Sequence, residues 1–154
     1  MDQKDDNSPL TATIALGADH AGYQMKEDLI NLLKNDGYGV ENFGTDSGES
    51  VDYPDFARSV ADRVSSGAVK FGILICGTGI GMSMAANHHP AIRAALCFTE
   101  DQAQITREHN DANVLCLGAH QISSEQAKLI VKKFLSTAFS GAARHERRIA
   151  KLSL

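Results

Sequence analysis

Cysteine is scarce in this 154-residue chain, which has three such residues, at positions 76, 97 and 116. An odd number at wide spacing does not suit a disulfide framework and fits a reducing compartment, so we expect a cytoplasmic protein. No Cys-x-x-Cys pair occurs, and Cys97 and Cys116 fall in predicted strands, where cysteine behaves as a small buried hydrophobic residue. We therefore expect no metal site.

Long apolar runs and an excess of charge of one sign are also absent. No segment has the length of a membrane-spanning helix, and the opening Met1–Asn7 lacks the pattern of a signal peptide. The net charge of −4 gives no reason to expect a nucleic acid or an anionic membrane as a partner. Length and a hydrophobic content of 43% fit one globular domain. We place it at residues 11–154, after a polar lead-in over 1–10 that we expect to be disordered.

Short apolar runs predict five β-strands, over Thr11–Leu16, Tyr38–Phe43, Val69–Cys76, Ile92–Cys97 and Val114–Leu117. Segments with helical spacing or capping residues alternate with them and predict helices, at about 23–36, 54–65, 82–88, 100–108, 124–139 and a basic one at 143–151. Thr99 and Ser123, each followed three residues later by glutamine, are expected caps. The alternation predicts an α/β fold: a single-domain, doubly wound (Rossmann-like) sheet of five parallel strands with helices on both faces.

The strand that ends at Cys76 leads into a loop with glycine at positions 77, 79 and 81. A buried strand, a glycine-rich turn and a helix N-terminus form an anion site, because unpaired N–H groups point at a closely approaching ligand. The same amides and the helix dipole favour a thiolate at Cys76, which we take as the catalytic centre. A packing turn is the alternative, but one glycine normally suffices for that. The spacing fits neither a dinucleotide fingerprint nor a P-loop.

Other polar residues follow the carboxyl ends of predicted strands, where ligands bind in doubly wound sheets. These are Asp19-His20 after the first strand, Phe98–Asp101 after the fourth and His120 after the fifth. Taken alone, Asp19-His20 could equally be a polar turn, and His109, at a helix end, could be only a cap. Arg144 and Arg148 lie one helical turn apart and suit a phosphate clamp, although a solvated basic face is the commoner reason for such a pair.

Seven short motifs follow one another along the chain: Gly17-Ala-Asp-His-Ala-Gly22, Asp52-Tyr-Pro54, Cys76-Gly-Thr-Gly-Ile-Gly81, Ala85-Ala-Asn87, Ile92-Arg93, His109-Asn-Asp-Ala-Asn113 and Arg144-His-Glu-Arg-Arg148. Together they resemble ribose-5-phosphate isomerase type B, of the LacA/LacB sugar-phosphate isomerases. The resemblance runs from about Ala12 to Ile149.

The resemblance implies interconversion of ribose 5-phosphate and ribulose 5-phosphate, in the pentose phosphate pathway, through an enediolate and with no metal or cofactor. Cys76 would move the proton between C1 and C2, and His109 would open the sugar ring. The enediolate oxygens would be held by backbone amides of the loop, with Thr78 and Asn110 beside them. These amides belong to Gly77, Gly79, Ile80 and Gly81. Ile80 stands where one branch of the family has a glutamate base, which leaves Cys76 as the only candidate.

Sugar and phosphate contacts are implied for the remaining residues. Asp19 would bind sugar hydroxyls, and the phosphate would be held by His20, Arg144 and Arg148. His120 stands where many members have a phosphate-binding arginine, and a histidine has a shorter reach and a pH-dependent charge. The resemblance also implies a homodimer, or a homotetramer of two dimers, whose sites combine Cys76 of one chain with the His109-Asn110 segment of the other.

Three other functions remain open from the residues. The same site could take a six-carbon aldose 6-phosphate, such as allose or galactose 6-phosphate. Cys76 and His109 could instead be the nucleophile and base of a hydrolase, or the loop could belong to a non-catalytic phosphate-binding module. Proton exchange with solvent separates these functions, because only an isomerase exchanges that proton.

Overall fold

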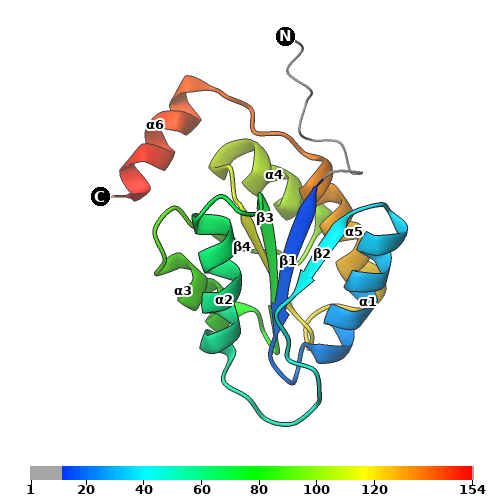
Figure 1. The fold of residues 1–154 in the computed structure, drawn as a ribbon. Helices are drawn as coiled ribbons and strands as arrows, with labels where there is room; N and C mark the ends of the chain where they lie inside the picture. The colour runs from blue at the N-terminus through cyan, green and yellow to red at the C-terminus, as the bar shows by residue number, and fades with distance from the viewer. Residues whose placement is uncertain (1–11, 154) are drawn as a thin grey trace.

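A computed structural model of the chain describes residues 12–153, which form one domain around a five-stranded parallel sheet (Figure 1). The strands are β1 (Thr13–Ala18), β2 (Gly39–Asn42), β3 (Phe71–Cys76), β4 (Ala94–Leu96) and β5 (Val114–Gly118). They lie in the order β2-β1-β3-β5-β4. All neighbouring pairs are parallel, so the carboxyl ends of all five strands meet at one edge, which lies at the bottom of Figure 1.

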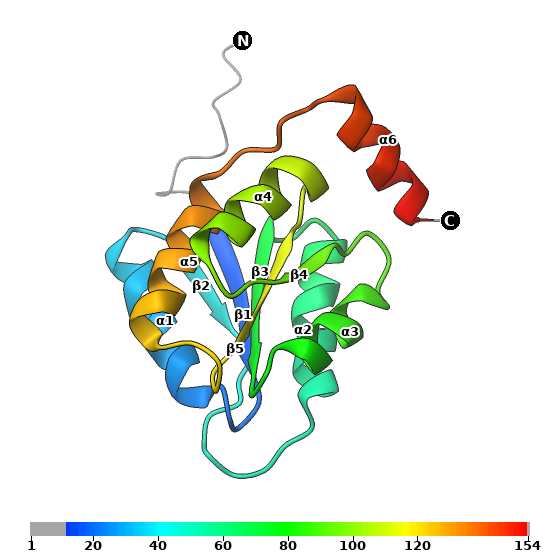
Figure 2. The same cartoon turned by 180° about the vertical axis from the view of Figure 1, so that it is seen from behind.

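Helices cover both faces of the sheet, as the two opposite views show (Figures 1 and 2). They are α1 (Tyr23–Asn35), α2 (Tyr53–Ser65), α3 (Ile80–Asn87), α4 (Glu100–Asn110), α5 (Ser124–Ser136) and α6 (Ala143–Leu152). Buried side chains of α1, α4 and α5 pack on one face, and those of α2 and α3 pack on the other. The last helix, α6, stands apart from the sheet at the end of a long link, with His145 as its one buried residue.

The alternation of side chains along each strand divides the core into two layers. Ile73 and Ile75 of β3 belong to the layer under α1, α4 and α5, whereas Leu74 and Cys76 belong to the layer under α2 and α3. All six residues of β3 are buried. The central strand is therefore apolar throughout, as expected for a strand covered on both faces. Cys76 is the last residue of β3 and therefore lies at the carboxyl edge of the sheet.

The predicted fold class is confirmed, and so are five strands and six helices within residues 12–153. The two predicted helix caps are also confirmed: Thr99 Oγ1 accepts from the N–H of Gln102 at 3.1 Å, and Ser123 Oγ accepts from the N–H of Gln126 at 3.1 Å. The lead-in predicted for residues 1–10 lies outside the described residues.

Some predicted ends are wrong, and hydrogen bonds explain two of them. β4 begins at Ala94 and not at Ile92, because the N–H of Arg93 donates to the Asn113 side chain at 2.8 Å. It ends at Leu96, so Cys97 lies just outside the strand. α5 ends at Ser136 and not near Phe139, because the carbonyl of Thr137 accepts from Arg107 Nε at 3.1 Å. Of the helices within residues 12–153, none combines the length and apolar character needed to cross a bilayer.

Replacing Phe134 with alanine is expected to lower the free energy of unfolding by about 3–5 kcal/mol. Phe134 of α5 is fully buried, and its ring meets that of Phe71 edge-on, with 5.6 Å between the ring centroids. A cavity would therefore open between α5 and β3. Urea denaturation followed by circular dichroism measures the loss. Leu129→Ala on the same helix is the control, because Leu129 is half exposed. A similar loss in both variants would contradict the assignment of Phe134 to the core.

Candidate active site

The carboxyl edge of the sheet carries a cleft between β1 and β3, where the strand order reverses. After β1 the chain adds β2 on one side and then crosses through α2 to add β3 on the other. Such a switch point opens a crevice in which ligands of doubly wound sheets bind. Its volume is about 440 Å³, and it is lined by Asp19, Tyr53, Cys76, Gly77, Thr78, Ile80, Gly81 and Met84. Six of these eight residues belong to the predicted site.

Cys76 lies at the base of this cleft, and its sulfur accepts a backbone hydrogen bond. The N–H of Gly79 points back to Sγ at 3.1 Å. Gly79 adopts φ +76°, and a Cβ there would lie 2.5 Å from Leu96 Cδ1 and 2.9 Å from the carbonyl carbon of Leu117. Only glycine fits both this backbone conformation and this space. The turn that aims an N–H at the sulfur therefore depends on Gly79, and it places a donor beside the negative charge that Cys76 carries as a thiolate, the form that can act as a base.

The other two glycines of the loop face aromatic rings. A Cβ at Gly81 would lie 2.5 Å from the Tyr53 ring, and one at Gly77 would lie 2.8 Å from His120 Cδ2. Thr78 Oγ1 accepts from the N–H of Ile80 at 3.2 Å. Close packing thus accounts for part of the glycine content that we attributed to anion binding. It also brings His120 against the loop, where the backbone N–H of His120 donates to the carbonyl of Gly77 at 2.9 Å.

Asp19 and His20 extend the cleft from the end of β1. One oxygen of Asp19, Oδ1, accepts from the N–H groups of Ala21 and Gly22 at 3.0 and 3.1 Å, so this carboxylate holds the turn into α1. His20 is exposed, and its Nδ1 accepts from the N–H of Val51 at 3.2 Å. In the neutral ring the proton must then lie on Nε2, which leaves a donor on the solvent side. The long loop after β2 therefore orients His20.

The remaining predicted residues, His109, Asn110, Arg144 and Arg148, lie at the opposite edge of the sheet. We call these four the amino-edge group, and Asp19, His20, Cys76–Gly81 and His120 the carboxyl-edge group. α4 runs back from the end of β4 and delivers His109 to the start of β5, where Val114 pairs with Gly72. Cys76 pairs with Gly118 at the other end. Five residues of parallel strand separate the edges, roughly 15 Å. One chain therefore does not bring Cys76 and His109 together.

The amino-edge group is organised around two stacked histidine rings. The rings of His109 and His145 lie 4.2 Å apart between centroids, at an angle of 31°. His145 is buried, and its Nδ1 lies 2.9 Å from Ser140 Oγ. Burial, followed by the charges of His109, Arg144 and Arg148, lowers the pKa of His145. A neutral His145 ring thus supports His109, while Arg144 and Arg148 are exposed on α6.

The other two cysteines are buried, as predicted. Burial raises the pKa of Cys97 to about 11, and it raises that of Cys116 still further. Both thiols therefore stay protonated at neutral pH. Among residues 12–153, no cluster of three or more His, Cys, Asp or Glu side chains has the arrangement of a metal site.

Two residues that line the cleft escaped the sequence-based prediction. Tyr53 opens α2, and Met84 lies one turn after Ile80 on α3; all three side chains are substantially exposed. An exposed apolar pair at this helical spacing is the signal that could have identified Met84. In contrast, the Phe98–Asp101 segment does not line the cleft. β5 separates β4 from β3, and Thr99 is used to cap α4.

Comparison with known proteins identifies the family of the chain. The sequence profile of the Ribose/Galactose Isomerase family matches residues 14–152. Ribose-5-phosphate isomerase B of Escherichia coli is 43% identical over 140 residues, which cover 91% of this chain and 93% of that protein. The structure of Clostridium thermocellum ribose-5-phosphate isomerase B superposes with a TM-score of 0.90 at 48% identity, covering 92% of this chain and 95% of that one. A Thermotoga maritima ribose 5-phosphate isomerase gives 0.90 at 51% identity, with coverage of 92% and 97%. The chain therefore belongs to the ribose/galactose isomerase family.

Proposed function

We propose that the protein interconverts D-ribose 5-phosphate and D-ribulose 5-phosphate through an enediolate, with Cys76 as the base. The observation that carries this proposal is the hydrogen bond from the Gly79 N–H to Cys76 Sγ at the base of the cleft. Proton transfer between C1 and C2 needs a base beside the carbon and donors for the oxygen that becomes negative. The names of the Escherichia coli and Clostridium relatives support the choice of substrate.

Each residue of the carboxyl-edge group has a role in this proposal. Cys76 removes the proton from C2 of the aldose and returns it to C1. The Gly79 and Ile80 amides already donate to Cys76 and Thr78, so the other loop amides and the Thr78 hydroxyl hold the enediolate oxygens. Asp19 accepts from sugar hydroxyls. His20 donates through Nε2, the nitrogen that its contact with Val51 leaves available, and His120 reaches the phosphate from the end of β5.

The amino-edge group completes the site only if it comes from a second chain. His109 protonates the ring oxygen and opens the furanose, Asn110 holds the enediolate, and Arg144 and Arg148 hold the phosphate. A two-fold dimer would pair each cleft with the amino edge of the other subunit and so form two equivalent sites. The exposed apolar side chains support this assembly, because Ile80 and Met84 rim the cleft and Leu152 protrudes from α6.

Solvent deuterium incorporation tests the proposed function directly. The protein is incubated in D₂O with ribose 5-phosphate or with allose 6-phosphate, and deuterium at the carbon next to the carbonyl is measured by mass spectrometry. We expect deuterium to be incorporated as the ketose forms. We also expect the rate to be higher with ribose 5-phosphate than with allose 6-phosphate. A faster rate on allose 6-phosphate would assign the site to six-carbon substrates. Phosphosugar binding without deuterium exchange would indicate a non-catalytic binding module. Acyl transfer from an activated ester would indicate a hydrolase.

A further inference from the structure

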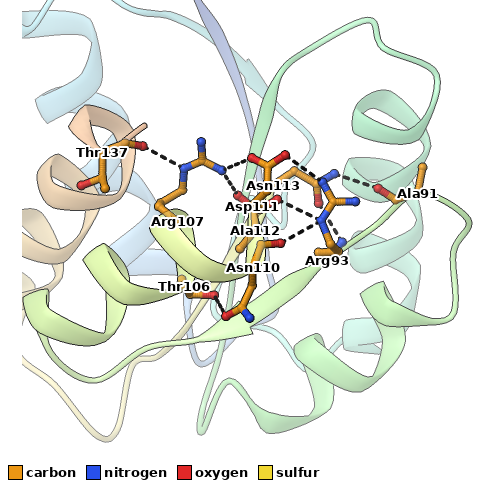
Figure 3. Close-up of polar contacts among 9 residues, drawn as sticks. All are labelled: Ala91, Arg93, Thr106, Arg107, Asn110, Asp111, Ala112, Asn113 and Thr137. Carbon is orange, nitrogen blue, oxygen red and sulfur yellow. Dashed lines mark hydrogen bonds and ion pairs between the residues drawn. The ribbon is translucent and has the colours of Figure 1, made fainter. Parts of the chain in front are cut away.

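Arg107 of α4 is a buried cation with no role in the proposed chemistry. Its side chain is 4% exposed, and its guanidinium lies 4.8 Å from the centroid of the Phe71 ring and 5.7 Å from that of Phe134. A charge in such surroundings is costly unless its donors are satisfied. The described partners are Asp111, Ala112 and Thr137 (Figure 3).

These partners hold the end of α4. Arg107 Nη1 donates to Asp111 Oδ1 at 2.9 Å and to the carbonyl of Ala112 at 2.6 Å. Arg93 holds Asp111 from the other side, through Oδ2 at 3.3 Å and the backbone carbonyl at 3.0 Å. Asp111 has φ +46° and follows His109-Asn110 directly. Two arginines therefore fix the turn that ends the helix immediately after the His109-Asn110 pair.

The same guanidinium ties this helix end to the link that leads to α6. Arg107 Nε donates to the carbonyl of Thr137, the first residue after α5. Three residues later, the N–H of Ser140 donates to the carbonyl of Glu108 at 3.2 Å, and Ser140 Oγ meets His145 Nδ1. His145 then stacks on His109. The link is thus attached to α4 at the two residues before His109, and α6 contacts His109 itself through His145.

We propose that Arg107 is a positioning residue: it fixes the end of α4 against the link to α6 and thereby keeps the His109 ring on His145. Its kinetic consequence rests on the proposed function, because His109 is the acid that opens the sugar ring. Displacement of the ring by about 1 Å can lower a catalytic rate by up to about a hundredfold.

Arg107→Lys tests this role in the full-length protein. Lysine keeps the charge but loses the planar fork that reaches Asp111, Ala112 and Thr137 together. Arg63→Lys is the matched control, because Arg63 makes a two-pronged contact with Glu41, through Nε and Nη2, on α2 and β2. The ring signals of His109 and His145 are recorded by NMR on histidine-labelled protein. We expect both signals to shift in Arg107→Lys and to stay in place in Arg63→Lys.

The kinetic readout is kcat in both directions. We expect a loss of at least about tenfold for ribose 5-phosphate, which must be opened, and a smaller loss for ribulose 5-phosphate, which is already open. Unchanged ring signals in Arg107→Lys would overturn the proposal. Shifted signals with an undiminished kcat for ribose 5-phosphate would also overturn it.

Two provisions keep the test decisive. If Arg107→Lys does not fold, Asp111→Asn replaces it, because asparagine tolerates the positive φ while losing the charge that both arginines hold. If the wild-type protein does not isomerise ribose 5-phosphate, the proposed function fails, and the ring signals alone then decide whether Arg107 positions His109.

Discussion

Cys76→Ala is expected to lower kcat for ribose 5-phosphate by about 10²–10⁴-fold, the usual contribution of a positioned base. Phosphosugar affinity should change little, because the thiolate acts in the transition state of proton transfer and contributes little to binding of the sugar in the ground state. The substitution removes one atom at the base of the cleft and leaves the Gly79 turn in place. Turnover is measured by ketose formation, and affinity by isothermal titration calorimetry.

Cys97→Ala is the control for this experiment. It removes another buried thiol, one that packs in the opposite layer of the core and has a raised pKa. We expect Cys97→Ala to lose some stability and to keep its kcat. If the kcat of Cys76→Ala stays within about threefold of the wild-type value, the loss is smaller than the removal of a catalytic base would cause. Cys76 would then have no place in the proton transfer.

Mixing Cys76→Ala with His109→Ala is expected to restore activity that neither variant has alone. In a heterodimer with shared sites, one site inherits both lesions and the other inherits none. Random pairing by co-refolding should leave about a quarter of all sites intact, since half of the dimers are mixed and half of their sites are whole. The specific activity of the mixture should therefore approach a quarter of the wild-type value.

Two controls accompany the mixture. Each variant is refolded alone, to show that refolding itself restores nothing, and native mass spectrometry establishes that mixed dimers have formed. The roughly 15 Å between the two edges of one sheet is the reason to expect complementation. If mixed dimers are present and the activity stays at the level of the single variants, Cys76 and His109 do not share a site across two chains.

Local features of this protein were predictable from its sequence. The strand that ends at Cys76, the glycine turn and the following helix appear where the residues indicated, because each depends on near neighbours in the chain. The caps at Thr99 and Ser123 were identified for the same reason. The resemblance to a family named the candidate residues as one set. It also implied that Cys76 and the His109-Asn110 segment belong to different chains, and within one chain they lie at opposite edges of the sheet.

Features that depend on contacts between distant parts of the chain, or on the order of the strands, were not predictable. The position of β4 at the outer edge removes Phe98–Asp101 from the cleft, and no local pattern indicates that position. The Tyr53 ring fills the space above Gly81 from a different helix, so the glycine looked like part of an anion site alone. The contacts of Arg107 join α4 to the link before α6, and a sequence shows only an arginine near a helix end.

Because the two residue groups lie at opposite edges of the sheet, the proposed activity depends on the protein concentration. An enzyme whose site needs two chains loses activity on dilution, because dissociation removes the site and not merely the partner. Its specific activity would rise with total protein and level off above the dissociation constant of the dimer. Assays at nanomolar concentration would then report subunit association as much as catalysis. If the site is shared between two chains as proposed, a small molecule that binds at Met84 and keeps the second chain away would inhibit without resembling a sugar.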